Sequence, residues 1–173
     1  MRRYVVIFAL ILLAAFSRLI PHPANFTPIT AIALFSAAYL GRRIALIIPV
    51  AALLLSDYVI GFYGGMFWVY GSFLAIAAIG FLLRNGRSVP RILGATLSGS
   101  VLFFVVTNFG VWYSDRLYPR TGAGLAACYA AGIPFFRNTL AGDLFFVTSI
   151  FGLYYLAERF LLRPTVAPSP VND

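Results

Sequence analysis

Two acidic side chains lie inside long apolar segments of the sequence. Asp57 lies close to the end of segment 44–59, and Asp143 lies about five residues into segment 138–162. At 1.5 Å per residue, Asp143 is expected about 7 to 8 Å below the end of its segment. A carboxylate buried at that depth costs several kcal/mol unless it is paired or faces water. Each acid is therefore a candidate either for ligand binding or for a structural pair with Arg18, Arg137 or a helix N-terminus.

Amides, hydroxyls and aromatic rings gather at the same ends of the apolar segments. A cavity with aromatic walls, a few amides and carboxylates suits a flat small molecule that carries heteroatoms. We expect the Trp residues to stack on such a ligand, the Asn residues to hydrogen-bond to it, and the acids either to recognise a cation or to brace loops through Arg. Anchoring at the membrane interface and bonding between helices are the structural alternatives. The candidate binding residues are Asn25, Asp57, Trp68, Tyr70, Asn108, Trp112, Asn138 and Asp143.

The composition excludes an ordinary soluble domain. Of the 173 residues, 61% are apolar and 10% are charged, and the mean hydropathy is +0.91. Soluble domains carry roughly a quarter charged residues, so the lipid bilayer is expected to surround this chain. The basic residues are scattered singly or in pairs and form no basic stripe, which argues against binding of nucleic acid.

Catalysis and metal binding have little support in the sequence. His22 and Cys128, the single histidine and the single cysteine, lie on different predicted loops. The sequence lacks the motifs of serine hydrolases, zinc proteases and intramembrane aspartyl proteases, and it lacks a P-loop. We therefore expect neither an enzyme nor a bound metal or other cofactor.

Six apolar segments predict an all-α integral membrane protein with six transmembrane helices. They are too continuous for the alternating strands of an outer-membrane barrel. The second and third are shorter than the ~20 residues that cross hydrocarbon, so five or four spans stay open as alternatives. We expect one transmembrane domain over residues 1–163 and a disordered cytoplasmic tail over residues 164–173. The segments are 4–20, 26–40, 44–59, 66–83, 92–113 and 138–162.

The arginines indicate the orientation, because cytoplasmic loops are enriched in basic residues. With six spans, nine arginines fall on one side and four on the other, which places both termini in the cytoplasm of a bacterial inner membrane. The N-terminal run also resembles a secretory signal, but its removal would leave five spans and break this arrangement. The nine are Arg2, Arg3, Arg42, Arg43, Arg84, Arg87, Arg91, Arg159 and Arg163.

Prolines and small residues mark two further features. Pro28 lies at the beginning of its predicted span, whereas Pro49 lies inside one and is expected to kink or shorten it. The run TGAGLAACYAAG, residues 121–132, precedes Pro134 and is expected to form a short helix or re-entrant cap over the outer mouth of the bundle.

The stretch NFTPITAIALFSAAYLGRRIALIIPVAALLLSDYVIGFY resembles the early region of the substrate-binding S components of energy-coupling-factor transporters. The shared features are an Asn-x-x-Pro entry, a Gly between two short helices and an acid near the end of the next helix. The segments GATLSGSVLFFVVTNFGVWY and IPFFRNTLAGDLFF extend the similarity over roughly residues 18–155. The sequence segments RLIPHPANFTPI and PFFRNTLAGDLFF also resemble those of a group of small bacterial membrane proteins with no assigned function.

The resemblance to S components implies a six-helix bundle with an outward-facing vitamin site capped by outer loops. It also implies a separate transmembrane coupling protein with two ATPases as partners. The first helix departs from the small-x-x-x-small coupling patch of that family. Four residues after Ala9 stands Leu13, and four residues after Ala14 stands Arg18, so neither pair consists of two small residues. The expected function is uptake of a vitamin or similar micronutrient. The alternative is a structural or assembly-factor membrane protein without a small-molecule ligand.

Overall fold

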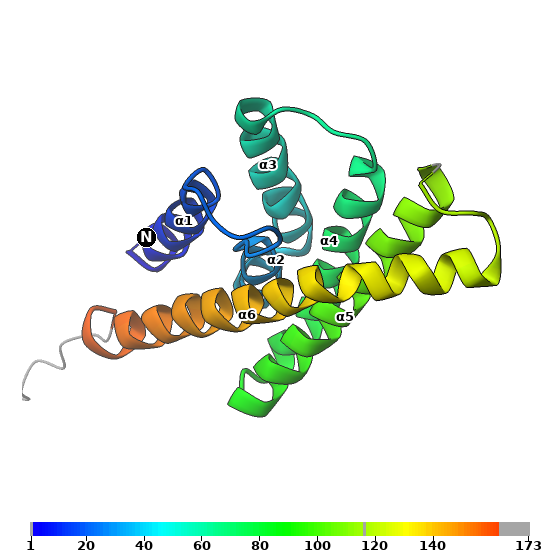
Figure 1. Ribbon diagram of the computed structural model, residues 1–173. Coiled ribbons are helices and arrows are strands. Elements are labelled where there is room, and N and C mark those ends of the chain that lie inside the picture. The colour runs from blue at the N-terminus through cyan, green and yellow to red at the C-terminus, as the bar shows by residue number, and fades with distance from the viewer. Residues whose placement is uncertain (1, 116, 163–173) are drawn as a thin grey trace, which may run out of the picture.

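The computed structural model describes residues 2–115 and 117–162, and all regular secondary structure in this part of the chain is helical. The helices pack side by side, and the long α6 runs across the others (Figure 1). The prediction of an all-helical fold is confirmed for these residues, and the predicted tail, 164–173, lies outside them. The elements are α1 (Arg2–Ser17), α2 (Ile29–Tyr39), α3 (Arg42–Ile60), α4 (Met66–Gly80), the 3-10 helix η1 (Phe81–Asn85), α5 (Val89–Ser114) and α6 (Gly122–Phe160).

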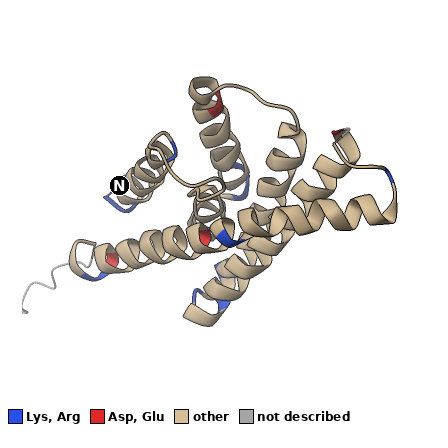
Figure 2. Ribbon diagram, in the orientation of Figure 1, with Lys and Arg blue, Asp and Glu red and all other residues tan. Residues whose placement is uncertain are grey.

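Four helical stretches among the described residues are long and apolar enough to cross a membrane. They are α3, α4 together with η1, α5 and α6. Large apolar side chains cover their outer surfaces, and Phe67 and Leu55 are 81% and 71% exposed. Figure 2 shows long uncharged stretches of helix, with most charged residues near helix ends. Such surfaces suit acyl chains rather than water, so the fold is that of a multi-pass membrane protein.

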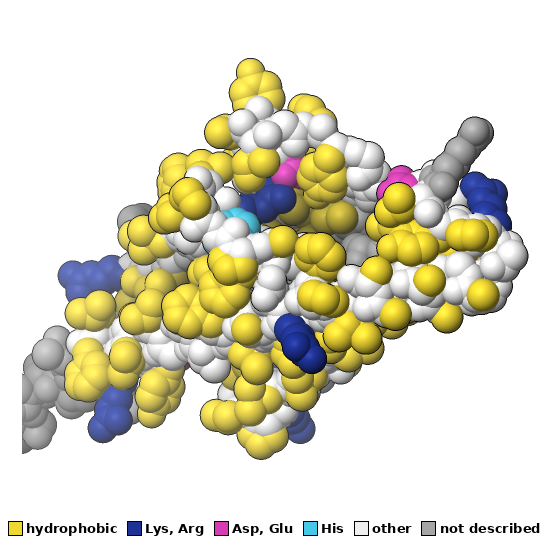
Figure 3. Space-filling model, in the orientation of Figure 1, with side chains coloured by type: hydrophobic (Ala, Val, Ile, Leu, Met, Phe, Trp, Pro, Cys, Tyr) yellow, Lys and Arg dark blue, Asp and Glu magenta, His cyan; other side chains and the backbone are white. Residues whose placement is uncertain are grey.

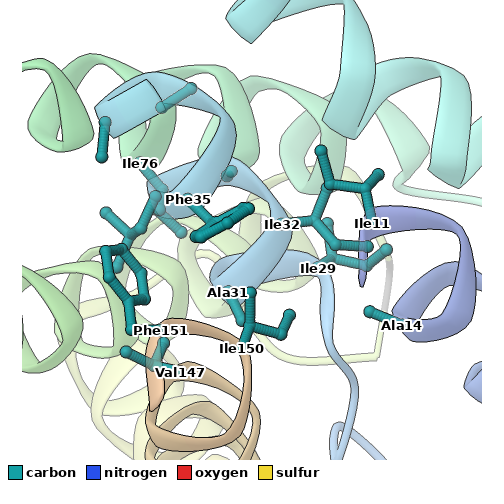
Figure 4. Close-up of a cluster of buried hydrophobic side chains, with 14 of the residues drawn as sticks. Ile11, Ala14, Ile29, Ala31, Ile32, Phe35, Ile76, Val147, Ile150 and Phe151 are labelled. Atoms are coloured by element: carbon teal, nitrogen blue, oxygen red, sulfur yellow. The ribbon is translucent and has the colours of Figure 1, made fainter. Parts of the chain in front are cut away.

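The short helix α2 lies at the centre of the bundle. Every residue from Ile29 to Ala38 is buried, and α2 contacts α1, α3, α4, α5 and α6. Figure 4 shows side chains from α1, α2, α4 and α6 packed into one apolar cluster. With 11 residues, α2 is about 16 Å long, roughly half of the ~30 Å hydrocarbon core. The helices of the first two predicted spans are thus present, but α1 and α2 are shorter than the four long stretches, and six spans are not confirmed.

Arginines from η1 and the loop after it cap the carbonyl end of α2. Arg84 donates through Nε to the carbonyl of Ala37 at 2.8 Å and through Nη2 to that of Leu40. Arg87 donates to the carbonyl of Ala38 at 3.1 Å. A helix C-terminus has unpaired carbonyls and a partial negative charge. The guanidinium groups donate hydrogen bonds to the carbonyls, and their positive charge balances the partial negative charge. The capping arginines therefore fix α2 against the end of α4.

Pro49 lies inside a continuous α3, so the helix is not shortened there. Proline has no N–H to donate to the carbonyl four residues earlier, which belongs to Ala45. The hydroxyl of Ser36 in α2 lies 3.2 Å from this carbonyl and 3.2 Å from the carbonyl of Ala33 in its own helix, so the two carbonyls share its proton. A neighbouring helix thus supplies the hydrogen bond that proline removes.

The main departure from the sequence prediction lies between residues 121 and 138. A separate short helix or re-entrant cap was expected there, and that expectation is wrong because α6 is a single helix of 39 residues that includes Pro134. At 1.5 Å per residue it is about 58 Å long, almost twice the hydrocarbon thickness. Thr121 caps its start by accepting a hydrogen bond from the N–H of Gly124 at 3.1 Å. Gly132 lets α6 pack closely on α5, where a Cβ would collide with Asn108, and this packing favours a continuous helix.

Both ends of the described chain lie at one end of the bundle (Figure 1). Near the start of α1, Arg3 donates to the hydroxyl of Tyr154 in α6 at 2.8 Å. The guanidinium groups of Arg3 and Arg87 lie 5.8 and 4.5 Å from the ring of Tyr39 at the end of α2. The loops 18–28 and 61–65 lie away from this end and border the candidate site.

Candidate ligand-binding site

A cavity of about 330 Å³ lies beneath loop 18–28 and among helices α2 to α6; we call it the Asp143 cavity. Figure 3 shows basic, acidic and histidine side chains gathered in a hollow between apolar surfaces. Residues from both loops and from five helices line the cavity, so it forms only when these elements have packed together. Its polar lining consists of Arg18, His22, Asn25, Thr27, Thr30, Tyr63, Thr139 and Asp143.

Asp143 of α6 is buried, with 2% of its surface exposed. Its Oδ2 accepts a hydrogen bond of 2.6 Å from the hydroxyl of Ser100 in α5, and the hydroxyl of Thr30 in α2 is a further hydrogen-bonding neighbour. Among the described residues no cationic side chain lies within 4 Å of this carboxyl group. A Cβ on Gly142 would lie 3.0 Å from the Cα of Phe26, so loop 18–28 rests directly on α6 beside the acid.

Asp57 of α3 has a different environment, because it is paired. It is fully buried, and its Oδ1 lies 2.7 Å from Nη1 of Arg18. Its Oδ2 accepts a hydrogen bond of 2.8 Å from the hydroxyl of Tyr70 in α4. Arg18, whose side chain is 11% exposed, also donates to Ser56. Asp57 therefore braces loop 18–28 against α3 and α4, while Arg18 lines the cavity above it.

Tyr63 and His22 border the Asp143 cavity from the two loops. Partial desolvation, followed by the Asp57 carboxylate, raises the pKa of the Tyr63 phenol, which is 43% exposed, and the nearby Arg18 guanidinium opposes this. The hydroxyl therefore keeps its proton at neutral pH and can donate a hydrogen bond. The ring nitrogens of His22 lie 2.9 and 3.2 Å from the carbonyl oxygens of Pro23 and Arg18, which hold the imidazole within its own loop.

A second cavity of about 330 Å³ lies between α4, α5 and α6; we call it the Asn108 cavity. It shares Asn25, Val69 and Phe103 with the Asp143 cavity, so the two adjoin. Asn108 donates through Nδ2 to the carbonyl of Phe104 at 2.8 Å, and a Cβ on Gly132 of α6 would collide with its Oδ1. The two cavities together form an elongated space with an acid in one part and an amide in the other.

Asn25 lies where the two cavities meet. Its backbone has φ = 63°, the left-handed conformation that Asn adopts more readily than most residues. The residue is exposed, which puts its amide at the rim rather than deep in the bundle. A polar side chain at this junction can contact a ligand in either cavity.

The structure places three of the eight predicted residues in the cavity lining: Asn25, Asn108 and Asp143. Asp57 and Tyr70 lie directly behind the lining, because Asp57 pairs with Arg18 and Tyr70 donates to Asp57.

Both tryptophans and Asn138 are outside the lining of the two cavities. Trp68 donates to the Ser114 hydroxyl at 2.9 Å, and Trp112 donates to the Pro119 carbonyl at 3.0 Å. The two rings thus secure the ends of α4 and α5, and the half-buried Asn138 lies elsewhere on α6.

The aromatic walls that the structure does provide are Phe73 and Phe103, which sequence reasoning missed. Their ring centroids lie 5.1 Å apart. Phenylalanine is abundant in this chain, with 17 residues, so no local signal separates these two from the lipid-facing ones. Thr30 and Ser100 beside Asp143 were missed for a similar reason, because hydroxyl residues in apolar helices commonly bond to their own backbone.

The fold and cavities define a helical multi-pass membrane protein with a polar, aromatic-walled space toward one end. The chain belongs to the family of unknown function DUF6580, which matches residues 1–166. No curated protein and no solved structure matches it.

Proposed function

We propose that this protein binds a vitamin or similar micronutrient in an outward-facing pocket formed by the Asp143 and Asn108 cavities and releases it to the cytoplasm. The observation that carries the proposal is the pair of adjoining cavities, which hold a buried acid, an amide and two aromatic walls. A protein that served only as a scaffold has no need to enclose such a space, because unfilled volume forfeits packing energy.

The orientation belongs to the same proposal. The arginine distribution favours both termini in the cytoplasm of a bacterial inner membrane, with α1 and α2 as short additional spans. The contact between Arg3 and Tyr154 supports this arrangement, since it brings the beginning and the end of the described chain together. The cavities then lie toward the outer side, under loop 18–28.

The resemblance to S components supports a separate coupling module driven by two ATPases. The sequence has no P-loop with which the chain could hydrolyse ATP itself. In this proposal the chain supplies the binding site, and the partners supply the energy for release. The departure in the first helix means that docking would use a surface other than the usual small-residue patch.

Native mass spectrometry of the gently purified full-length protein tests the proposal. We expect a co-purified small molecule, visible as a discrete added mass that collisional activation removes. Gly132→Ala should lower its occupancy, because the new Cβ pushes the Asn108 amide into the cavity. Gly122→Ala is the matched control, since a Cβ at Gly122 meets nothing within 4 Å and lies in the same helix.

Alanine substitution of Asn108 and Asp143 separates uptake from scaffolding. Once the co-purified molecule is identified, loss of its uptake with normal membrane abundance supports the binding function. Loss of membrane abundance in both variants, with no molecule bound to the wild type, supports the structural or assembly role instead.

A further inference from the structure

The charges that face the Asp143 cavity are unbalanced. Arg18 is the one lining guanidinium among the described residues, and its charge is matched by Asp57 at 2.7 Å. The Asp143 carboxyl has hydroxyl neighbours but no described cation within 4 Å. Arg137, on the same helix, is exposed and does not line the cavity. When Asp143 is ionised, the wall therefore presents one negative charge without a fixed partner.

This imbalance disfavours an anionic ligand. An anion would have to compete with Asp57 for Arg18 and would also lie near a second buried carboxylate. Removing a charge from water is compensated only when an opposite charge or several hydrogen-bond donors meet it. A cation meets this condition at Asp143, where the acid is already in position.

The remaining lining suits the body of an organic cation. Phe73 and Phe103 offer aromatic faces on the same cavity, and such faces attract positive charge when water is excluded. The volume of about 330 Å³ lies near the lower end of the range for small-molecule sites, which excludes a corrinoid-sized ligand from this cavity. Tyr63 and Thr139 add hydroxyls for orientation.

Resting on the uptake function proposed above, we propose that the ligand is a small organic cation with an aromatic or heteroaromatic ring. Its positive charge pairs with the Asp143 carboxylate, and its ring lies against Phe73 and Phe103. Asp57 does not share this role, because Arg18 and Tyr70 already occupy its two oxygens.

A charge series of probes tests this inference on the full-length protein in detergent by isothermal titration calorimetry. The probes are nicotinamide methylated on its ring nitrogen, nicotinamide itself and nicotinate, which are cationic, neutral and anionic molecules of similar shape. We expect the cation to bind more than about tenfold more tightly than the neutral probe, and nicotinate to bind most weakly. Asp143→Asn should remove the preference for the cation. Glu158→Gln, which changes an acid near the C-terminal end of α6 that does not line this cavity, should keep it.

Equal affinity for the three probes, or tightest binding of nicotinate, overturns the inference and leaves the uptake proposal intact. If none of the three probes binds and a neutral or anionic molecule co-purifies in native mass spectrometry, the inference of a cationic ligand is likewise overturned and the uptake proposal stands. Failure of all three with no co-purified molecule overturns both proposals. If Asp143→Asn does not accumulate in the membrane, the probe series on the wild-type protein decides the question alone.

Discussion

Ser36 of α2 donates a hydrogen bond to the carbonyl of Ala45 in α3, with 3.2 Å between the two oxygens. This is the carbonyl that Pro49 leaves without a helical donor, and Ser36 is fully buried. We predict that Ser36→Ala lowers the free energy of unfolding by about 1 kcal/mol, because the carbonyl then loses the hydroxyl donor from α2 in an apolar interior. Chemical or thermal unfolding of the purified protein in detergent measures this.

Pro49→Ala provides the control, because residue 49 then has an N–H for the carbonyl of Ala45. In that background Ser36→Ala should cost clearly less than in the wild type. Equal costs in the two backgrounds would mean that the hydroxyl and the proline are not coupled.

The helices themselves could be predicted from the sequence, because length and continuous apolarity suffice for that. Two features could not be predicted. Residues 121–132 carry Gly and precede Pro134, which are ordinary breaking signals, yet close contact between Gly132 and Asn108 favours one continuous helix. The complete burial of α2 depends on contacts with five other helices, and no local pattern encodes them.

Some residues of the candidate site could likewise be predicted from the sequence, and others could not. Buried acids and amides are conspicuous in an apolar chain, so Asp143 and Asn108 could be found from the sequence alone. The two acids have the same residue type and are similarly buried. Only the fold pairs Asp57 with Arg18 and leaves Asp143 without a cation among the described residues. The aromatic walls could not be predicted, since Phe73 and Phe103 differ from lipid-facing phenylalanines only in their tertiary position.

The ion pair between Arg18 and Asp57 is expected to behave as one unit. Asp57→Asn leaves a guanidinium that is 11% exposed without its counter-charge, and we predict a loss of about 3 kcal/mol in the free energy of unfolding. The double variant Arg18→Gln, Asp57→Asn should lose less than the sum of the two single variants. Thermal unfolding in detergent measures the loss of unfolding free energy for the two single variants and for the double variant.

Asp115→Asn is the matched control for this pair, because Asp115 is an exposed acid in the loop after α5. Its substitution should leave the unfolding temperature unchanged. Strict additivity of Arg18→Gln and Asp57→Asn would show that the two side chains do not depend on each other.

The contact between α2 and α4 is predicted to tolerate no larger residue at Gly80. A Cβ there would lie 2.7 Å from the Cβ of Ala37 and 3.1 Å from the Cα of Leu34, so the two helices must separate. We expect Gly80→Ala to destabilise the protein by about 1 to 3 kcal/mol. Gly71→Ala in the same helix meets nothing within 4 Å and should be neutral or stabilising, since Ala favours helix. Similar unfolding temperatures for the two variants would argue against this close packing.

The two ends of α3 provide a test of orientation. In a Cys128→Ser background, single cysteines at Gly41 and Gly64 lie in the loops before and after this helix, and neither position has an atom within 4 Å of its new Cβ. Because basic loops stay in the cytoplasm, we expect a membrane-impermeant maleimide to label Gly64→Cys on intact cells and Gly41→Cys only after permeabilisation. The reverse pattern would place the mouth of the Asp143 cavity on the cytoplasmic side. It would then exclude uptake through an outward-facing site, even if both cavities bind ligand.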